Sequence, residues 1–171
     1  MAHSPIAHHP PQGSNTMSDS PFKPRDPDFA QRCRDSFGRQ PFMAFLGATL
    51  RTIRPGFAEI VLPAGPKLRQ QHGYYHGGVI ASVLDSAAGY AAFSLVPPGM
   101  SILTVEYKLN FLLPGEGDEL IARGQVVRPG RTLTVVQADA FGAARGAERM
   151  CATSIQTLMA IAERPDGAPG S

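Results

Sequence analysis

The sequence has few cysteines, no run of basic residues and no uninterrupted apolar segment long enough to span a membrane. Its 16 basic and 14 acidic residues are scattered and give a formal net charge of +2, which argues against an electrostatic nucleic-acid surface. Cys33 and Cys151 lie far apart, and the N-terminus lacks a secretory signal, so we expect free thiols in a reducing cytoplasm. The longest mostly apolar run, 79–98, contains Asp85 and three serines, which favours a buried helix.

Length and composition predict one compact domain, because 171 residues with 43% hydrophobic side chains can bury a substantial core. Residues 1–27 hold six of the 16 prolines and few aliphatic side chains, so we expect a disordered extension there. This segment is interpreted as a flexible arm or a cloning-derived leader, with Met17 as a candidate natural start. The folded domain is expected over 28–162, followed by a flexible tail at 163–171.

Hydrophobic periodicity predicts two helices and five to six strands. The helices are expected over 29–38 and 79–93, and the second is apolar on almost all sides. The strands are expected at 48–53, 57–62, 103–111, 119–128, 132–141 and 149–161. In the third strand Thr104 belongs to a polar set that alternates with apolar residues, which predicts one wet face. Short connections make the sheet antiparallel, and the economical architecture is an α+β fold with a curved sheet around one helix.

Asp85 is the one charged residue in the 79–93 helix, and an unpaired buried charge is costly. Its neighbours one turn away are alanines, a serine and Gly89, which leave space beside the carboxylate. Glycine in a helix interior costs roughly 1 kcal/mol relative to alanine, so something is expected to approach the backbone there. Two readings remain open: a catalytic carboxylate, or a buried aspartate satisfied by the backbone.

The segment 70–78 leads into this helix and is rich in glycine. Bare N–H groups at a helix N-terminus favour developing negative charge, so Gly77 and Gly78 are candidate oxyanion donors, although a simple turn is the competing interpretation. His76 is assigned a positioning role. No acidic residue or cysteine stands at ligand spacing around His72 and His76, so no metal site is expected.

Three stretches together resemble the phenylacetate-pathway (PaaI-like) branch of the hotdog thioesterases. They are His76–Gly89, Leu103–Glu106 and Val126–Leu133, and the resemblance extends over about 40–161. It implies the hotdog fold, and it implies the activity of a cytoplasmic acyl-CoA thioesterase.

The resemblance also implies roles for individual residues. Gly77 would supply an oxyanion N–H, Asp85 would act as base or nucleophile, and Gln70 would orient water or substrate at a position where many relatives have asparagine. Thr104 falls where the family has a serine or threonine near the acidic residue. No cofactor is expected, because coenzyme A is part of the substrate.

Helix geometry supports a site shared between two chains. Eight residues at about 1.5 Å each place Gly77 and Asp85 about 12 Å apart along the helix, too far to act on one thioester carbon. The family pairs the glycine of one subunit with the carboxylate of the other, so the resemblance implies a homodimer or a homotetramer built as a dimer of dimers.

Arg128 and Arg131 flank a Pro-Gly turn and are candidate contacts for the phosphates of coenzyme A, or solvated turn residues. Aromatic and methionine side chains are candidates for an aryl or medium-chain acyl pocket: Phe42, Met43, Phe45, Tyr74, Tyr75 and Tyr90. Two other functions remain open, an enoyl-CoA hydratase or dehydratase of the same fold and a non-catalytic acyl-CoA-binding module.

Overall fold

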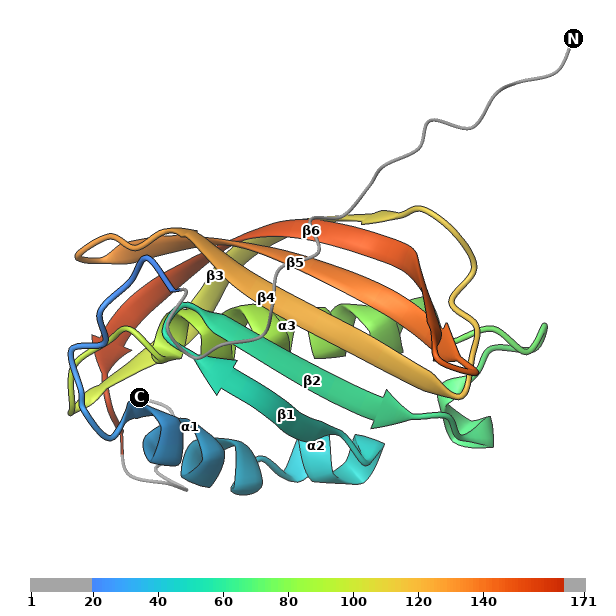
Figure 1. Ribbon diagram of the computed structural model, residues 1–171, viewed down its shortest axis with the longest axis horizontal. Helices are drawn as coiled ribbons and strands as arrows, with labels where there is room; N and C mark the ends of the chain where they lie inside the picture. Colours follow the sequence, from blue (N-terminus) through green and yellow to red (C-terminus); the bar gives the residue numbers. More distant parts are fainter. Residues whose placement is uncertain (1–19, 165–171) are drawn as a thin grey trace, which may run out of the picture.

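The computed structural model describes residues 20–164, and its centre is one curved antiparallel sheet of six strands in the order β1-β2-β4-β5-β6-β3 (Figure 1). The strands are β1 (Thr49–Arg54), β2 (Phe57–Pro63), β3 (Met100–Phe111), β4 (Glu119–Arg128), β5 (Leu133–Ala144) and β6 (Ala147–Ala162). All six predicted strands are present within a few residues of their expected bounds. The predicted α+β architecture is confirmed.

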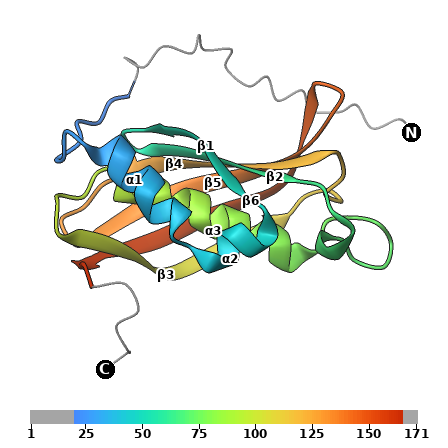
Figure 2. The same ribbon diagram turned by 90° about the horizontal axis from the view of Figure 1, so that it is seen from below.

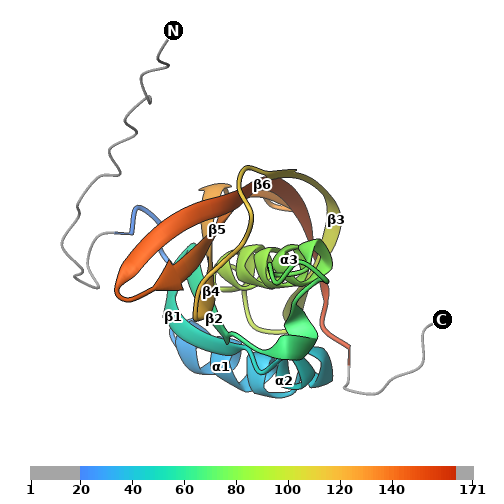
Figure 3. The ribbon, with the colours of Figure 1, turned by 90° about the vertical axis from the view of Figure 1, so that its right-hand side faces the viewer.

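The helices are α1 (Phe29–Gly38), α2 (Pro41–Leu46) and α3 (Gly77–Phe93), with a short 3-10 turn at Pro66–Leu68. The sheet wraps around α3, whereas α1 and α2 lie together on the other side of that helix (Figures 2 and 3). Sequence periodicity predicts α1 and α3. It misses α2, because six residues are too few to establish a helical period.

Helix α3 rests directly on the concave face of the sheet because the facing residues are small. Ala122, Ala138 and Ala140 are fully buried there. At Gly124 in β4 a Cβ atom would lie 2.4 Å from the carbonyl oxygen of Ala87, so no larger residue fits without moving the helix. This close contact explains why a helix that is apolar almost all round forms the core.

A β-bulge in β3 interrupts the regular alternation of side chains between the two faces of the sheet. Thr104 pairs with Leu158 and Glu106 pairs with Thr157, so Val105 is an extra residue on the β3 side. Because Leu158 is fully buried on the concave face, its partner Thr104 also faces α3. Thr104 is nevertheless exposed, as predicted, and what differs from the prediction is the regular alternation, which the bulge interrupts.

The folded part of the chain begins before residue 28, where the sequence analysis placed its boundary. Phe22 packs against the core, and Asp26 is buried and paired with Arg32 at 2.8 Å. The remainder of the predicted extension and of the C-terminal tail, residues 1–19 and 165–171, lies outside the described residues.

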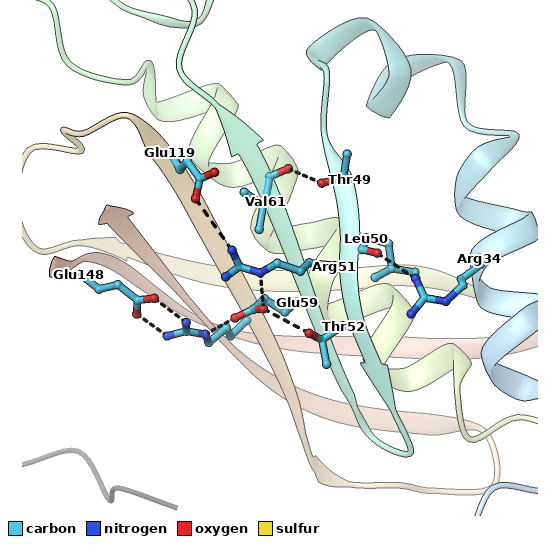
Figure 4. Close-up of polar contacts among 10 residues, drawn as sticks. Arg34, Thr49, Leu50, Arg51, Thr52, Glu59, Val61, Glu119 and Glu148 are labelled. Carbon is cyan, nitrogen blue, oxygen red and sulfur yellow. Dashed lines mark hydrogen bonds and ion pairs between the residues drawn. The ribbon is translucent and has the colours of Figure 1, made fainter. Parts of the chain in front are cut away.

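The outer face of the sheet carries a charge network centred on Glu59 of β2 (Figure 4). Its carboxylate accepts hydrogen bonds from Nε of Arg51 at 2.8 Å and Nε of Arg123 at 2.7 Å. Arg123 also forms two hydrogen bonds to Glu148, at 2.6 and 2.7 Å. Burial alone would raise the pKa of Glu59, but the two arginines outweigh it and the pKa is lowered.

Candidate active site

Asp85 lies on α3 and faces the N-terminal half of β3. Its side chain is half-buried, and Oδ1 accepts a hydrogen bond from Oγ1 of Thr104 at 2.7 Å. The β3 bulge makes this contact, because it turns the threonine toward the helix. Oδ2 has no partner within residues 20–164, so one carboxylate oxygen is fixed and the other is available to a bound molecule.

A cavity of about 400 Å³ opens beside Asp85, between α3, β3 and the junction of α1 and α2. Gly89 forms part of its wall, and a Cβ atom there would meet nothing within 4 Å. The small residues near Asp85 therefore do leave open space. The cavity is lined by Ser36, Gln40, Asp85, Ser86, Gly89, Tyr90, Phe93, Ser101, Ile102, Leu103 and Thr104.

The cavity also has a polar cluster around the hydroxyl of Tyr90. Nε2 of Gln40 donates to this hydroxyl at 2.8 Å, and Oγ of Ser36 lies 3.2 Å from it. Ser36 and Tyr90 share one hydrogen bond but have two hydroxyl protons, so one proton has no acceptor among the described residues. Burial raises the pKa of Tyr90, although the hydrogen bonds from Ser36 and Gln40 act in the opposite direction.

Of the six side chains proposed for the acyl pocket, only Tyr90 lines this cavity. Met43 and Tyr75 are buried in the core, while Phe42 and Phe45 are exposed. Tyr74 is half-buried in the loop before α3. Sequence reasoning missed Ser36 and Gln40, because no local pattern links them to a helix about fifty residues away.

The N-terminus of α3 presents the second part of the predicted site. His76 is the N-cap residue, and its Nδ1 accepts a hydrogen bond from the N–H of Gly78 at 2.9 Å. This bond orients the imidazole at the helix N-terminus, and a positioning role for His76 in catalysis stays a prediction. The N–H of Gly77 has no acceptor within residues 20–164. The ring of Phe111 lies over this glycine, 3.1 Å from where a Cβ atom would be.

Gln70 lies in the loop that precedes α3, and its side chain is partly used by that loop. Its Oε1 accepts a hydrogen bond from the N–H of His72. Its side-chain nitrogen has no partner in the described part of the chain. The amide therefore retains donor capacity but is not in contact with Asp85.

One chain does not bring Gly77 and Asp85 together. Both residues lie on the same continuous helix, so the separation of about 12 Å expected from the helical rise applies. The two arginines predicted to bind phosphate lie in different surroundings. Arg131 lines a cavity beyond the C-terminal end of α3, and Arg128 does not line it.

No group of three histidine, cysteine, aspartate or glutamate side chains suited to a metal ion is found between residues 20 and 164. Within the same range, none of the helices has the length and apolar character needed to cross a membrane.

Comparison with known proteins gives concordant results. The sequence profile described as the thioesterase superfamily matches residues 72–146, which include part of the loop before α3, the helix and strands β3, β4 and β5. A thioesterase family protein of Silicibacter pomeroyi is 52% identical to this chain, and the match covers 79% of this chain and 99% of that one, with a TM-score of 0.77.

Two further similarities are more distant. The medium/long-chain acyl-CoA thioesterase YigI of Escherichia coli and Salmonella typhimurium is 25% identical over 114 residues, covering 58% of this chain and 74% of YigI. The PaaI protein of the Escherichia coli phenylacetic acid degradation operon is 22% identical, with a TM-score of 0.69 over 78% of this chain and 94% of PaaI. At this identity the PaaI similarity concerns the fold.

Proposed function

The chain belongs to the thioesterase superfamily with the hotdog fold and is a thioester hydrolase, and from this premise we propose that it hydrolyses an aryl- or medium-chain acyl-CoA to CoA and a free carboxylic acid. One observation carries the proposal: a carboxylate, Asp85, has one oxygen fixed by Thr104 and the other free beside a cavity of about 400 Å³. The acyl group would occupy this cavity, with its thioester carbonyl near Asp85.

In the proposed reaction Asp85 either removes a proton from water as the water attacks the thioester carbon, or attacks that carbon itself to form an anhydride that water then cleaves. The free N–H of Gly77 would stabilise the negative charge that develops on the carbonyl oxygen. Thiolate is a good leaving group, and water is the second substrate, so the reaction needs no cofactor.

A second copy of the chain would complete the site. Strand β3 is an edge strand of 12 residues, and several of its apolar side chains are exposed by 49–56%: Leu103, Val105, Tyr107 and Phe111. A long apolar edge of this kind favours pairing with another strand. Antiparallel pairing of two β3 strands would place two α3 helices side by side in opposite directions, which allows Gly77 of one chain to approach Asp85 of the other.

The first test is thiol release from a panel of aryl- and alkyl-CoA thioesters by wild type and by Asp85→Asn. The variant should lose several orders of magnitude in kcat while remaining folded, because it keeps the size of the side chain without its charge. Asp139→Asn is a matched control, since Asp139 also accepts a threonine hydroxyl, from Thr153 at 2.6 Å, but lies on the outer face of the sheet. Hydration of an enoyl-CoA without thiol release, or binding without turnover, would reject the proposal.

A complementation experiment tests the shared site. Gly77→Pro removes the proposed N–H donor, and the backbone tolerates proline there because Gly77 is the first helical residue and His76 has φ −62° and ψ 138°. Gly77→Ala is the control, because it adds the same Cβ atom near Phe111 but keeps the N–H.

Gly77→Pro and Asp85→Asn should each be nearly inactive alone. When they are mixed by refolding or coexpression, half of the dimers are mixed and each mixed dimer has one intact site, so about one quarter of wild-type activity should return. No recovery in verified mixed dimers would place both groups in one chain and contradict the shared site.

A further inference from the structure

A second cavity, of about 300 Å³, lies at the end of the molecule where α3 stops. Its walls come from segment 21–25, from residues 95–97 after α3, and from the turn between β4 and β5. Figure 1 shows segment 21–25 (blue) and this turn (orange) at the same end of the sheet. The lining residues are Pro21, Phe22, Lys23, Arg25, Leu95, Val96, Pro97, Met100, Pro129, Gly130, Arg131, Thr134 and Ala160.

The charges of this cavity all have the same sign. Its ionisable lining residues are Lys23, Arg25 and Arg131, and no carboxylate from residues 20–164 lines it. None of the three cations forms a hydrogen bond or an ion pair with any residue from 20 to 164. Asp26, the nearest acidic residue in sequence, is instead paired with Arg32 at 2.8 Å. Three cations without a counter-ion among the described residues therefore line one cavity, and an anion is the ligand that would compensate them.

The C-terminal end of α3 would by itself disfavour an anion here, because the last carbonyl groups of a helix carry partial negative charge. The carbonyl groups of the last helical turn already accept hydrogen bonds from Ser94, Leu95 and Val96, and Arg32 binds the backbone that follows them. Its guanidinium donates to the carbonyl oxygens of Val96 at 2.6 Å, Pro97 at 3.0 Å and Met100 at 3.3 Å. The cavity therefore keeps a net positive lining.

The N-terminal cations are held in place by a specific anchor. Oγ of Ser20 donates to the carbonyl oxygen of Pro55 at 2.6 Å and accepts from the N–H of Phe22 at 3.2 Å. The ring of Phe22 lies against Gly56, where a Cβ atom would come within 2.5 Å of it. This contact fixes the backbone immediately before Lys23 and Arg25, so their position at the cavity is not that of a loose terminal segment.

We propose that this cavity binds the phosphate groups of a nucleotide, with Lys23, Arg25 and Arg131 as the phosphate contacts. Part of the lining is apolar and includes Phe22 and Met100. Such a surface can contact the base and sugar of a nucleotide, whereas an inorganic anion would make no use of it. The inference rests on the proposed function in one respect: the nucleotide end of the acyl-CoA is one source of these phosphates, and a separate nucleotide is the other.

The distance along the molecule is compatible with the first source. Phe93, the last residue of α3, follows Asp85 by 8 residues, which corresponds to about 12 Å along the helix, and the cavity lining begins beyond it at Leu95. Coenzyme A separates its thioester from its phosphates by the long pantetheine arm. A thioester at Asp85 and phosphates beyond the end of the same helix would therefore occupy opposite ends of one extended substrate.

The test is calorimetric titration of the full chain with adenosine 3′,5′-bisphosphate, the nucleotide end of coenzyme A, and separately with inorganic phosphate. Wild type should bind the nucleotide more tightly than phosphate. Lys23→Ala, Arg25→Ala and Arg131→Ala should each weaken nucleotide binding about tenfold, the loss typical of one charge-assisted contact. Arg149→Ala, which removes an exposed cation outside the cavity, is the charge-matched control and should leave the affinity unchanged.

Kinetics then distinguish the two sources. If the phosphates belong to the substrate, the three variants raise KM for acyl-CoA but not for the corresponding acyl-pantetheine, and the nucleotide inhibits competitively. If they belong to a separate nucleotide, KM is unchanged and nucleotide and substrate bind together. Equal binding of nucleotide by wild type and all three variants, or no binding at all, overturns the inference. Failure of the proposed function would appear differently, as absent thiol release with nucleotide binding intact.

Discussion

Replacing Glu59 by glutamine should destabilise the fold, because this carboxylate is the centre of the outer charge network. Its side chain is 11% exposed and accepts hydrogen bonds from two arginines at 2.7 and 2.8 Å. The glutamine amide can accept from one guanidinium but turns an NH2 group toward the other. We expect a loss of about 2–4 kcal/mol in the free energy of unfolding, the range for breaking a largely buried ion pair on one side.

The assay is thermal or urea unfolding at one fixed protein concentration, since self-association would add to the apparent stability. For a chain of this length a loss of that size lowers Tm by roughly 4–16 °C. Two control variants test whether the loss of stability falls as the exposure of the carboxylate rises. Glu148→Gln removes a partner that is 35% exposed, and Glu119→Gln removes one that is 45% exposed and 3.9 Å from Arg51. They should cost about 1 kcal/mol and less than about 0.5 kcal/mol.

The effect should also depend on pH. The pKa of Glu59 is lowered in the folded protein, so its contribution is present above the unfolded value of about 4.3 and is lost as pH falls through the lower folded value. The stability difference between wild type and Glu59→Gln should therefore shrink between about pH 7 and about pH 3. A difference that stays constant, or an equal cost for Glu119→Gln, would refute the reasoning.

Three other predictions concern the site, the core and the cysteines. Thr104→Val should lower kcat about tenfold or more with little change in KM, whereas Thr104→Ser should retain most activity, because only the serine keeps the hydrogen bond to Asp85, the proposed catalytic carboxylate. Gly124→Ala should cost several kcal/mol in urea unfolding, since its Cβ would lie 2.4 Å from a carbonyl oxygen of α3, while Gly38→Ala, with nothing within 4 Å, should be nearly neutral. Cys33 and Cys151 should react with a thiol reagent slowly in the native state and rapidly in urea, because both side chains are buried. Burial also raises the pKa of the Cys33 thiol to about 12. Fast labelling of the native protein would contradict this prediction.

Much of the fold could be predicted from sequence because its signals are local. Strand β4 matches its expected range, 119–128, residue for residue, and α3 begins two residues before its expected start. Turn residues and hydrophobic periodicity act over a few positions, so one sequence contains enough information to place them. The short helix α2 and the ordered segment from residue 20 depend on tertiary contacts, such as Phe22 against Gly56, that no local pattern records.

The residues of the candidate site could likewise be predicted from the sequence only in part. Asp85 and Gly77 could be selected because a charge in the middle of an apolar helix and glycines at its N-terminus are conspicuous. The contact between Thr104 and Asp85 could be expected only from resemblance, since strict alternation would have turned the threonine away from the helix. Ser36 and Gln40 were out of reach, because their place in the cavity depends on how α1 packs against α3.

The bulge at Val105 also restricts how this sequence can change by insertion and deletion. Loss of one residue from most edge strands shortens a loop or a strand end. Loss of Val105 would restore regular pairing with β6 and leave Thr104 opposite Leu158 and Glu106 opposite Thr157, so the side chains on both sides of the bulge would keep their faces. Loss of a residue that has its own partner in β6 would instead disturb that pairing. Related chains that keep a hydroxyl next to the helix carboxylate should therefore accept the loss of position 105 more readily than the loss of a paired residue of this strand.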